Sequence, residues 1–246
     1  MQAVVALETP ITTENKTVAP QVRVGADAGV GADVDTNVRT QPLPYRFIKR
    51  TFDIVFSSAV IVVGFIPALI LSIFIAKDTK ASPIYSQIRM GKDKKPFKIY
   101  KFRSMVYDSD NVEKYLNEEQ LIEWMRERKV EDDPRITKLG SLIRKTSIDE
   151  IPQFINVLVG QMSVVGPRPI TEDELIHFKH DADKLLSMRP GITGWWQTQS
   201  RNDSSFDTGE RQTLELYYID NASVGLDMRI AVSTFSSMFG TGKKGR

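Results

Sequence analysis

The sequence of 246 residues contains no cysteine and only two histidines. The absence of cysteine excludes a disulfide scaffold, a cysteine nucleophile and any thiolate metal site. The chain also has no large excess of positive or negative charge, because 33 Lys and Arg against 31 Asp and Glu leave a net charge of +2. So small a bias gives no indication of nucleic-acid binding, and we expect no nucleic-acid partner. The motifs G-x-S-x-G, H-E-x-x-H and G-x-G-x-x-G are also absent.

The first 45 residues lack the features of a folded segment. Residues 18–40 are rich in Ala, Val, Gly, Asp and Thr, without a lasting helical or strand period. Such residues bury too little apolar area to offset the entropy of ordering, so we expect residues 1–45 to form a disordered tail. The segment also lacks the basic start, apolar core and processing site of a secretory signal.

A long run without charge follows the tail. The 23 residues Ile54–Ala76 contain no charged side chain and only three serines. A straight helix of that length covers roughly 35 Å, against roughly 30 Å for the hydrocarbon core of a bilayer. A soluble core helix this long would carry a polar stripe. We therefore predict that residues 46–80 form a basic flank and a membrane-inserted helix.

Pro67 divides this run into 13 and 9 residues, each too short to cross a bilayer alone. The run fits a kinked spanning helix, because membrane helices tolerate proline. It fits equally a helix that breaks at Pro67 and returns to the same side. Basic residues flank both ends, whereas a spanning helix normally shows a charge asymmetry. The sequence alone favours neither the spanning helix nor the returning helix.

Residues 81–246 have the composition of a water-soluble globular domain. We expect short strands between residues 84 and 103 and an exposed amphipathic helix over residues 108–130. Further helices are expected near residues 147–158, 171–187, 208–217 and 227–239, the second of them starting at a capping box, Thr171–Glu174. The expected fold is a helix-rich mixed α/β (α+β) domain with amphipathic helices that lie along the membrane interface.

Asp149 and Glu150 are the first candidates for chemistry. Ser147 and Glu150 have the spacing of a capping box, which would make the acids purely structural. Pro152 would then occupy the fifth helical position, where its ring clashes with the preceding turn. A helix that starts at Asp149 avoids the clash and places both carboxylates at a helix N-terminus, where phosphates also bind. Both interpretations stay open at this point.

Several cations lie in turn-rich positions where they could bind phosphate. They include Lys101, Arg103, Arg144 and Arg168, and Arg168 lies between two prolines that restrict its backbone. Each of them could equally be a solvated surface cation. Carboxylates, clustered cations and a divalent ion suggest phosphoryl transfer, in which Mg²⁺ is held by one or two carboxylates and by substrate phosphates.

Taken together, these segments resemble the bacterial sugar transferases, which are monotopic polyprenyl-phosphate phosphoglycosyl transferases. The resemblance covers residues 46 to 239 in order. The matching stretches are Lys49–Asp53, Gln87–Gly91, Lys101–Met105, Asp133–Thr137, Arg144–Gln153, Asn156–Pro169, Arg189–Trp195 and Tyr217–Asp227.

The resemblance implies transfer of a sugar-1-phosphate from a UDP-sugar to undecaprenyl phosphate, with release of UMP and a covalent aspartyl intermediate. This is the first membrane step of exopolysaccharide, capsule or O-antigen synthesis. Asp149 falls on the nucleophile and Glu150 on its partner. The phosphate- or substrate-binding positions are Lys101, Arg103, Arg144, Arg168 and Arg201. Mg²⁺ is the expected cofactor, and its expected ligands are Asp149 and Asp227, with Glu215 as a further candidate.

The resemblance also favours the re-entrant helix, with Pro67 as its break and both flanks in the cytoplasm. Residues 81–246 then form a cytoplasmic catalytic domain on the bacterial inner membrane. The lipid bilayer is a partner, and a homodimer and downstream glycosyltransferases are candidate partners.

The sequence departs from the family pattern at Glu215, where Asp is usual, and at Ser200, which replaces a glycine beside Arg201. The alternative function is a non-catalytic, membrane-anchored scaffold of a polysaccharide assembly complex. The intact pair Asp149-Glu150 argues against it. A glycosidase is excluded because neighbouring residues of a helix point apart and nothing fixes the separation of the two carboxylates.

Overall fold

The first element is a long helix, α1, Leu43–Thr79. The computed structural model describes residues 41–127, 130–199 and 208–239. α1 begins after Pro42, carries a second proline in its first turn and ends where Lys80 adopts a left-handed conformation, φ 53°. It is the one described helix that is long and apolar enough to cross a membrane, and only 6% of its most apolar window is buried.

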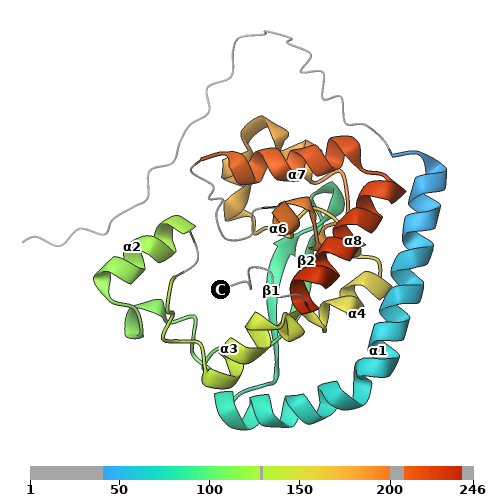
Figure 1. Ribbon diagram of the computed structural model, residues 1–246. Coiled ribbons are helices and arrows are strands. Elements are labelled where there is room, and N and C mark those ends of the chain that lie inside the picture. Colours follow the sequence, from blue (N-terminus) through green and yellow to red (C-terminus); the bar gives the residue numbers. More distant parts are fainter. Residues whose placement is uncertain (1–40, 128–129, 200–207, 240–246) are drawn as a thin grey trace, which may run out of the picture. The chain divides into compact units, whose positions relative to one another are not determined.

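α1 bends partway along its length, as Figure 1 shows. Pro67 lies inside the helix, where it donates no backbone hydrogen bond and its ring crowds the preceding turn. The backbone nevertheless remains helical through this residue. The helix therefore continues across Pro67, and the re-entrant arrangement stays a prediction.

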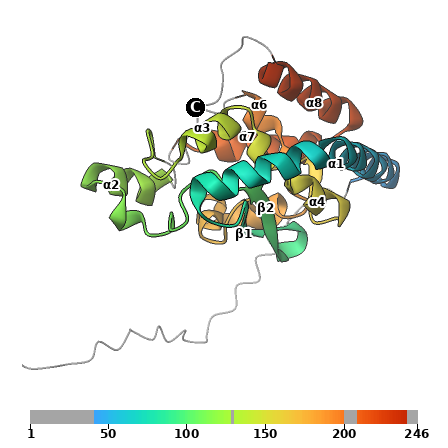
Figure 2. The same cartoon turned by 90° about the horizontal axis from the view of Figure 1, so that it is seen from below.

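A β-hairpin follows α1 and agrees with the strands expected between residues 84 and 103. β1, Ile84–Met90, pairs antiparallel with β2, Pro96–Phe102, and Ile84 lies opposite Phe102. The turn between them contains a short 3-10 segment, η1, Lys92–Lys94. Phe97, Ile99 and Phe102 of β2 point into the core of the domain. Figure 2 shows the hairpin from below, crossing behind α1.

The helices between the hairpin and residue 158 are shorter than expected. The expected helix over residues 108–130 is reduced to η2, Val112–Lys114, and α2, Glu118–Glu127. A helix that the sequence interpretation missed, α3, spans Lys138–Lys145 and is capped by the Thr137 side chain. The helix expected over residues 147–158 divides at Pro152 into η3, Ile148–Glu150, and α4, Gln153–Leu158.

The remainder of the domain adds a small parallel sheet and more helices. β3, Ser163–Val165, pairs with β4, Gly191–Thr193. Between them lie η4, Asp173–Asp181, and α5, Ala182–Leu185, where one longer helix was expected. The last helices are α6, Trp195–Gln199, α7, Glu210–Asn221, and α8, Val224–Phe239. The described fold is thus helix-rich and mixed α/β, as predicted.

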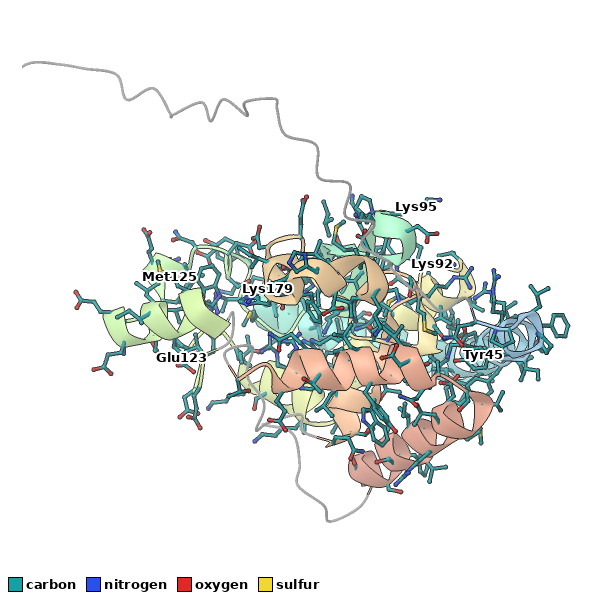
Figure 3. All side chains as sticks on the ribbon, turned by 90° about the horizontal axis from the view of Figure 1, so that it is seen from above. Tyr45, Lys92, Lys95, Glu123, Met125 and Lys179 are labelled. Atoms are coloured by element: carbon teal, nitrogen blue, oxygen red, sulfur yellow. The ribbon has the colours of Figure 1, made fainter. Side chains whose placement is uncertain are left out.

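Two apolar cores hold these elements together. The larger core joins β2, β3, α7 and α8 and includes Tyr45 from the start of α1. The smaller core consists of Ile75, Phe102 and Ile143, with Ala68 and Leu71 packed against it. α1 therefore contributes to one core from its first part and to the other from its second part. In Figure 3, Tyr45 lies at the opposite end of the view from Met125 of α2.

Candidate active site

The two candidate acids lie in a tight turn before a helix. η3 follows Ser147, which has a left-handed backbone conformation, φ 56°, and makes no side-chain capping bond. The capping-box interpretation of Ser147 and Glu150 is therefore wrong, since a residue in this conformation does not present its hydroxyl to the turn. Pro152 occupies the N-cap of α4, where it lacks only an N–H that the helix does not use. The acids thus precede the helix by a few residues.

The turn has an apolar side and a polar side. Ile148 and Ile151 pack against the smaller core, which contains the second part of α1. Asp149 is only 8% exposed, and Gln153 is 2% exposed. Burying both sides fixes the turn, so the carboxylates have little freedom to rotate towards bulk water.

A small hollow lies on the polar side of this turn. It brings together three residues selected from the sequence: Lys101, Glu150 and Arg168. The ammonium group of Lys101 donates to Glu150 Oε1 at 3.1 Å. The other lining residues are Arg89, Ile99, Gln153, Pro169, Gly191, Ile192 and Gln197. The hollow is therefore rich in cations and borders one of the two acids.

Arg168 presents its guanidinium to this hollow with an incomplete set of partners. Its backbone N–H donates to both oxygens of Glu215, at 3.2 and 3.1 Å, and its guanidinium lies 5.4 Å from the Trp196 ring centroid. Among the described residues, no ion pair or hydrogen bond of the guanidinium itself is found. A cation with unused donors in a hollow is suited to bind a phosphate.

Close backbone packing positions Arg168. A Cβ atom on Gly191 of β4 would lie 2.1 Å from the backbone nitrogen of Gly166, so only glycine allows this approach. The Gly191 N–H donates to the Pro167 carbonyl at 2.8 Å. The two prolines around Arg168 and this contact hold the segment in one conformation, as expected for a pre-aimed arginine.

Three charged residues beside Arg168 were not selected from the sequence. Arg89 donates to Glu174 at 2.9 Å, and Arg211 lies 3.7 Å from the same carboxylate. Burial raises the pKa of Glu174, but the Arg89 guanidinium and the Thr171 N–H outweigh it and hold this pKa below its usual range. Burial lowers the pKa of Arg211 to about 10. The hydrogen bond from the Thr171 N–H to Glu174, at 2.7 Å, is one of the two bonds of the capping box predicted for Thr171–Glu174.

Glu215 is the most deeply buried acid of this group. It is 2% exposed, and burial raises its pKa to about 7, although the Arg168 N–H and the Arg211 charge oppose the shift. Its carboxylate is used to hold the backbone of Arg168. Near neutral pH, a proton on Glu215 would compete with that contact.

Arg144 lies on the other side of the acids. Its guanidinium Nε donates to Ser104 Oγ at 2.7 Å and interacts electrostatically with Asp149. It lies in the last turn of α3, a helix that the sequence interpretation missed. The structure thus places cations on two sides of the pair Asp149-Glu150.

One predicted site residue, Arg103, lies away from the hollow. Arg103 donates to the Ser82 carbonyl at 2.9 Å and lies 5.6 Å from the Tyr85 ring centroid, outside the residues that line the hollow. Arg201 lies outside the described residues. Strand alternation could not have separated Arg103 from Lys101, because residues two apart point to the same face. The difference is that Lys101 lies within β2, which ends at Phe102, whereas Arg103 follows the strand.

Asp227 belongs to a different cluster. Its carboxylate accepts hydrogen bonds from Tyr45 at 3.0 Å, Lys49 at 2.7 Å and Tyr218 at 2.7 Å. These donors come from α1 and α7, so Asp227 joins the start of α1 to the C-terminal helices. Asp227 does not line the hollow, and its role as a metal ligand together with Asp149 stays a prediction.

The described residues contain no group of three or more His, Asp or Glu side chains that could hold a metal ion. The carboxylates of Glu215 and Asp227 are occupied by protein donors. Glu150 lines the cationic hollow, and Asp149 precedes it in the same turn. One or two carboxylates fit an Mg²⁺ ion that takes its remaining ligands from phosphates and water.

A pair of adjacent acids with cations nearby, carried by a domain with a long apolar helix, is typical of membrane-associated proteins that handle phosphate compounds. The model of the bacterial sugar transferase family matches residues 44–241, and the chain belongs to this family.

Curated relatives agree with this assignment. The chain is 43% identical over 192 residues to a UDP-galactose-lipid carrier transferase of Erwinia amylovora, covering 77% of this chain and 40% of the relative. The same values hold for an undecaprenyl-phosphate galactose phosphotransferase of Salmonella typhimurium. An exopolysaccharide production protein, ExoY, of Rhizobium meliloti is 38% identical over 194 residues, 77% of this chain and 84% of the relative. The chain therefore spans about two fifths of the first two relatives.

Proposed function

We propose that this protein transfers a sugar-1-phosphate from a UDP-sugar to a polyprenyl phosphate, with undecaprenyl phosphate as the acceptor, and releases UMP. The observation that carries the proposal is the hollow in which Lys101, Glu150 and Arg168 meet beside the buried Asp149. Two relatives are named for transfer to a lipid carrier or to undecaprenyl phosphate. The same chemistry on this chain would begin a polysaccharide repeat unit.

In the proposed reaction, a carboxylate oxygen of Asp149 attacks the phosphorus bonded to the sugar. A new P–O bond forms to Asp149, and the bond to the bridging oxygen of UMP breaks, so UMP leaves with that electron pair. A phosphate oxygen of the acceptor then attacks the same phosphorus. The acyl phosphate bond breaks, the Asp149 carboxylate is restored and the sugar diphospholipid is released.

The cations supply charge stabilisation in this scheme. Arg168 and Lys101 line the hollow next to Glu150, and Arg144 interacts with Asp149 from the other side. Positive groups that are fixed in advance stabilise the charge that develops on the transferred phosphoryl group. Glu150, which accepts from Lys101, holds that lysine in the hollow.

Asp149 and Glu150 are the residues that would hold Mg²⁺. When bound, the ion would neutralise charge on the diphosphate of the donor. Chelation with EDTA should stop UMP release, and added Mg²⁺ should restore it. A reaction that is insensitive to EDTA would remove the metal from the mechanism.

A re-entrant arrangement of α1 is part of the proposal. Tyr45, Lys49 and Asp53 from the first part contact the domain, and so does Ile75 from the second part. Both ends of the helix therefore contact the same folded unit, which favours both flanks lying on one side of the membrane. The catalytic domain would then lie on the cytoplasmic face of the bacterial inner membrane.

α8 offers a further contact with the bilayer. Val224, Met228, Val232 and Phe235 lie on one exposed face of this helix, at helical spacing. Asp227 of the same helix contacts Lys49 of α1, so the apolar face is near the membrane helix. We place this face at the membrane interface.

The test is UMP release by purified, detergent-solubilised protein given undecaprenyl phosphate, Mg²⁺ and a panel of UDP-sugars. We expect release with one sugar or a few related sugars, and release should depend on the acceptor over many turnovers. If the folded protein releases no UMP with any donor, this result would reject the proposal and favour the non-catalytic scaffold.

A further inference from the structure

The segment that carries the two acids presents a regular apolar edge to α1. Ile148 and Ile151 pack against the smaller core, which contains Ile75 from the second part of α1. Phe154, three residues further on, contacts the Phe56 ring in the first part, with ring centroids 5.9 Å apart. Both parts of the membrane helix therefore touch the segment that contains Asp149 and Glu150.

A row of three aromatic rings extends from this edge along α1. Phe52 and Phe56 stack with their centroids 5.4 Å apart and an interplanar angle of 13°, and Phe56 meets Phe154 at 58°. Both geometries are favourable for aromatic pairs. Phe52 is 38% exposed and Phe56 is 41% exposed, so the row keeps an open apolar surface.

Polar contacts fix the row in place. The Arg50 guanidinium donates to the carbonyls of Val157, at 2.6 Å, and Leu158, at 2.8 Å, at the end of α4. The buried carboxylate of Asp53 accepts from the Val164 N–H at 2.8 Å. These bonds lock α1 against α4 on the face beside the aromatic rings, so the row exists before any ligand binds.

The aromatic row connects two different surfaces. At one end, Phe52 also lines an apolar groove on the first part of α1, together with Phe47, Ile48, Thr51 and Val55. At the other end, Phe154 directly follows Gln153, which lines the cationic hollow with Glu150. The aromatic row and the lining of the hollow thus meet at consecutive positions of α4.

We propose that the row Phe52–Phe56–Phe154 binds the isoprenoid chain of the acceptor, in the units next to its phosphate. This inference rests on the proposed function. If the phosphate of the acceptor occupies the hollow, its hydrocarbon chain must leave the hollow along an apolar surface. The row is a candidate for this surface, because Phe154 directly follows Gln153 of the hollow. Binding of the isoprenoid chain, which does not react, would position the acceptor phosphate for attack on the phosphorus of the covalent intermediate.

The test compares KM values for the two substrates in Phe56→Leu and Phe154→Leu. Phe65→Leu is the matched control, because Phe65 is an aromatic residue of α1 that is 57% exposed and lies outside the row. We expect the KM for undecaprenyl phosphate to rise about fivefold in both row variants, since an aromatic contact contributes about 1 kcal/mol. The KM for the UDP-sugar should stay within twofold of the wild type.

Phe154→Tyr, which keeps the ring, should restore the acceptor KM, and thermal midpoints in the same detergent check the folding of every variant. An equal effect in Phe65→Leu, or a parallel change of both KM values, would overturn the acceptor site. Failure of the proposed function is distinguishable, because the wild type itself would then release no UMP.

Discussion

Two clusters in this molecule contain acids and cations at short range, and they differ in how completely they are satisfied. In the first, Asp227 accepts from Lys49, Tyr45 and Tyr218. In the second, the hollow beside Asp149, the Arg168 guanidinium has no ion pair or hydrogen bond among the described residues. Similar residue types therefore give a closed network in one place and an open one in the other.

The difference separates a structural contact from a binding site. The Asp227 network leaves no oxygen without a donor, so it joins α1 to α7 and α8. Donors that are left unused in the hollow can be used by a phosphate. The following predictions test this difference by changing residues of one cluster and comparing them with a matched reference.

The largest contrast is expected from the same substitution in the two clusters. Asp149→Asn should reduce turnover at least about a thousandfold, since the amide cannot act as the nucleophile. Its thermal midpoint in detergent should stay near that of the wild type. UMP release measured in parallel for Asp227→Asn should remain near wild-type turnover. Equal losses in the two variants would remove the distinction between the clusters.

The buried Glu215 should make stability depend on pH. Its pKa is about 7 in the folded protein against 4.5 for an ordinary glutamate, so the folded state binds the proton more tightly than the unfolded state. Relative to Glu215→Gln, the wild type should lose about 3 kcal/mol of stability as pH rises from about 4.5 to about 7, and nothing further above it. Thermal midpoints of both proteins across this range measure the effect, and parallel curves would contradict it.

The cations can be compared in the same way. Arg168→Gln should lower kcat/KM for the UDP-sugar about a hundredfold, because it removes charge from the hollow. Arg103→Gln serves as the matched control, since Arg103 contacts Ser82 and Tyr85 instead. We expect its kcat/KM to stay within about threefold of the wild type. A comparable loss at Arg103 would place that residue in the site.

The smallest effect should be on the stability of the closed cluster. Asp227→Asn keeps one acceptor but leaves the Lys49 charge without its carboxylate, which should cost about 2 kcal/mol. The thermal midpoint should fall while kcat is retained below the transition. Lys49→Met combined with Asp227→Asn should cost less than the two single changes added together. Strict additivity would show that the two side chains are not coupled.

Local features of the fold followed from the sequence where local physics dominates. The uncharged run Ile54–Ala76 predicted the apolar helix, and short β-prone runs bounded by turn residues predicted the strands that form β1 and β2. Prediction failed for α3, whose eight residues give too short a period to recognise. It also failed for the pair β3–β4, because three-residue strands separated by 25 residues are defined only by their partner.

The sequence by itself determined the composition of the site, including the acids Asp149 and Glu150 and the cations Lys101, Arg144 and Arg168. Only the tertiary structure decided which acid meets which cation. Lys101 and Glu150 are 49 residues apart, and Lys49 and Asp227 are 178 residues apart. The partners of such residues depend on how helices and strands pack, and not on local preference. For this reason the contact of Asp227 with Lys49 at the start of α1 was not predicted, and the pairing of Asp227 with Asp149 stays a prediction.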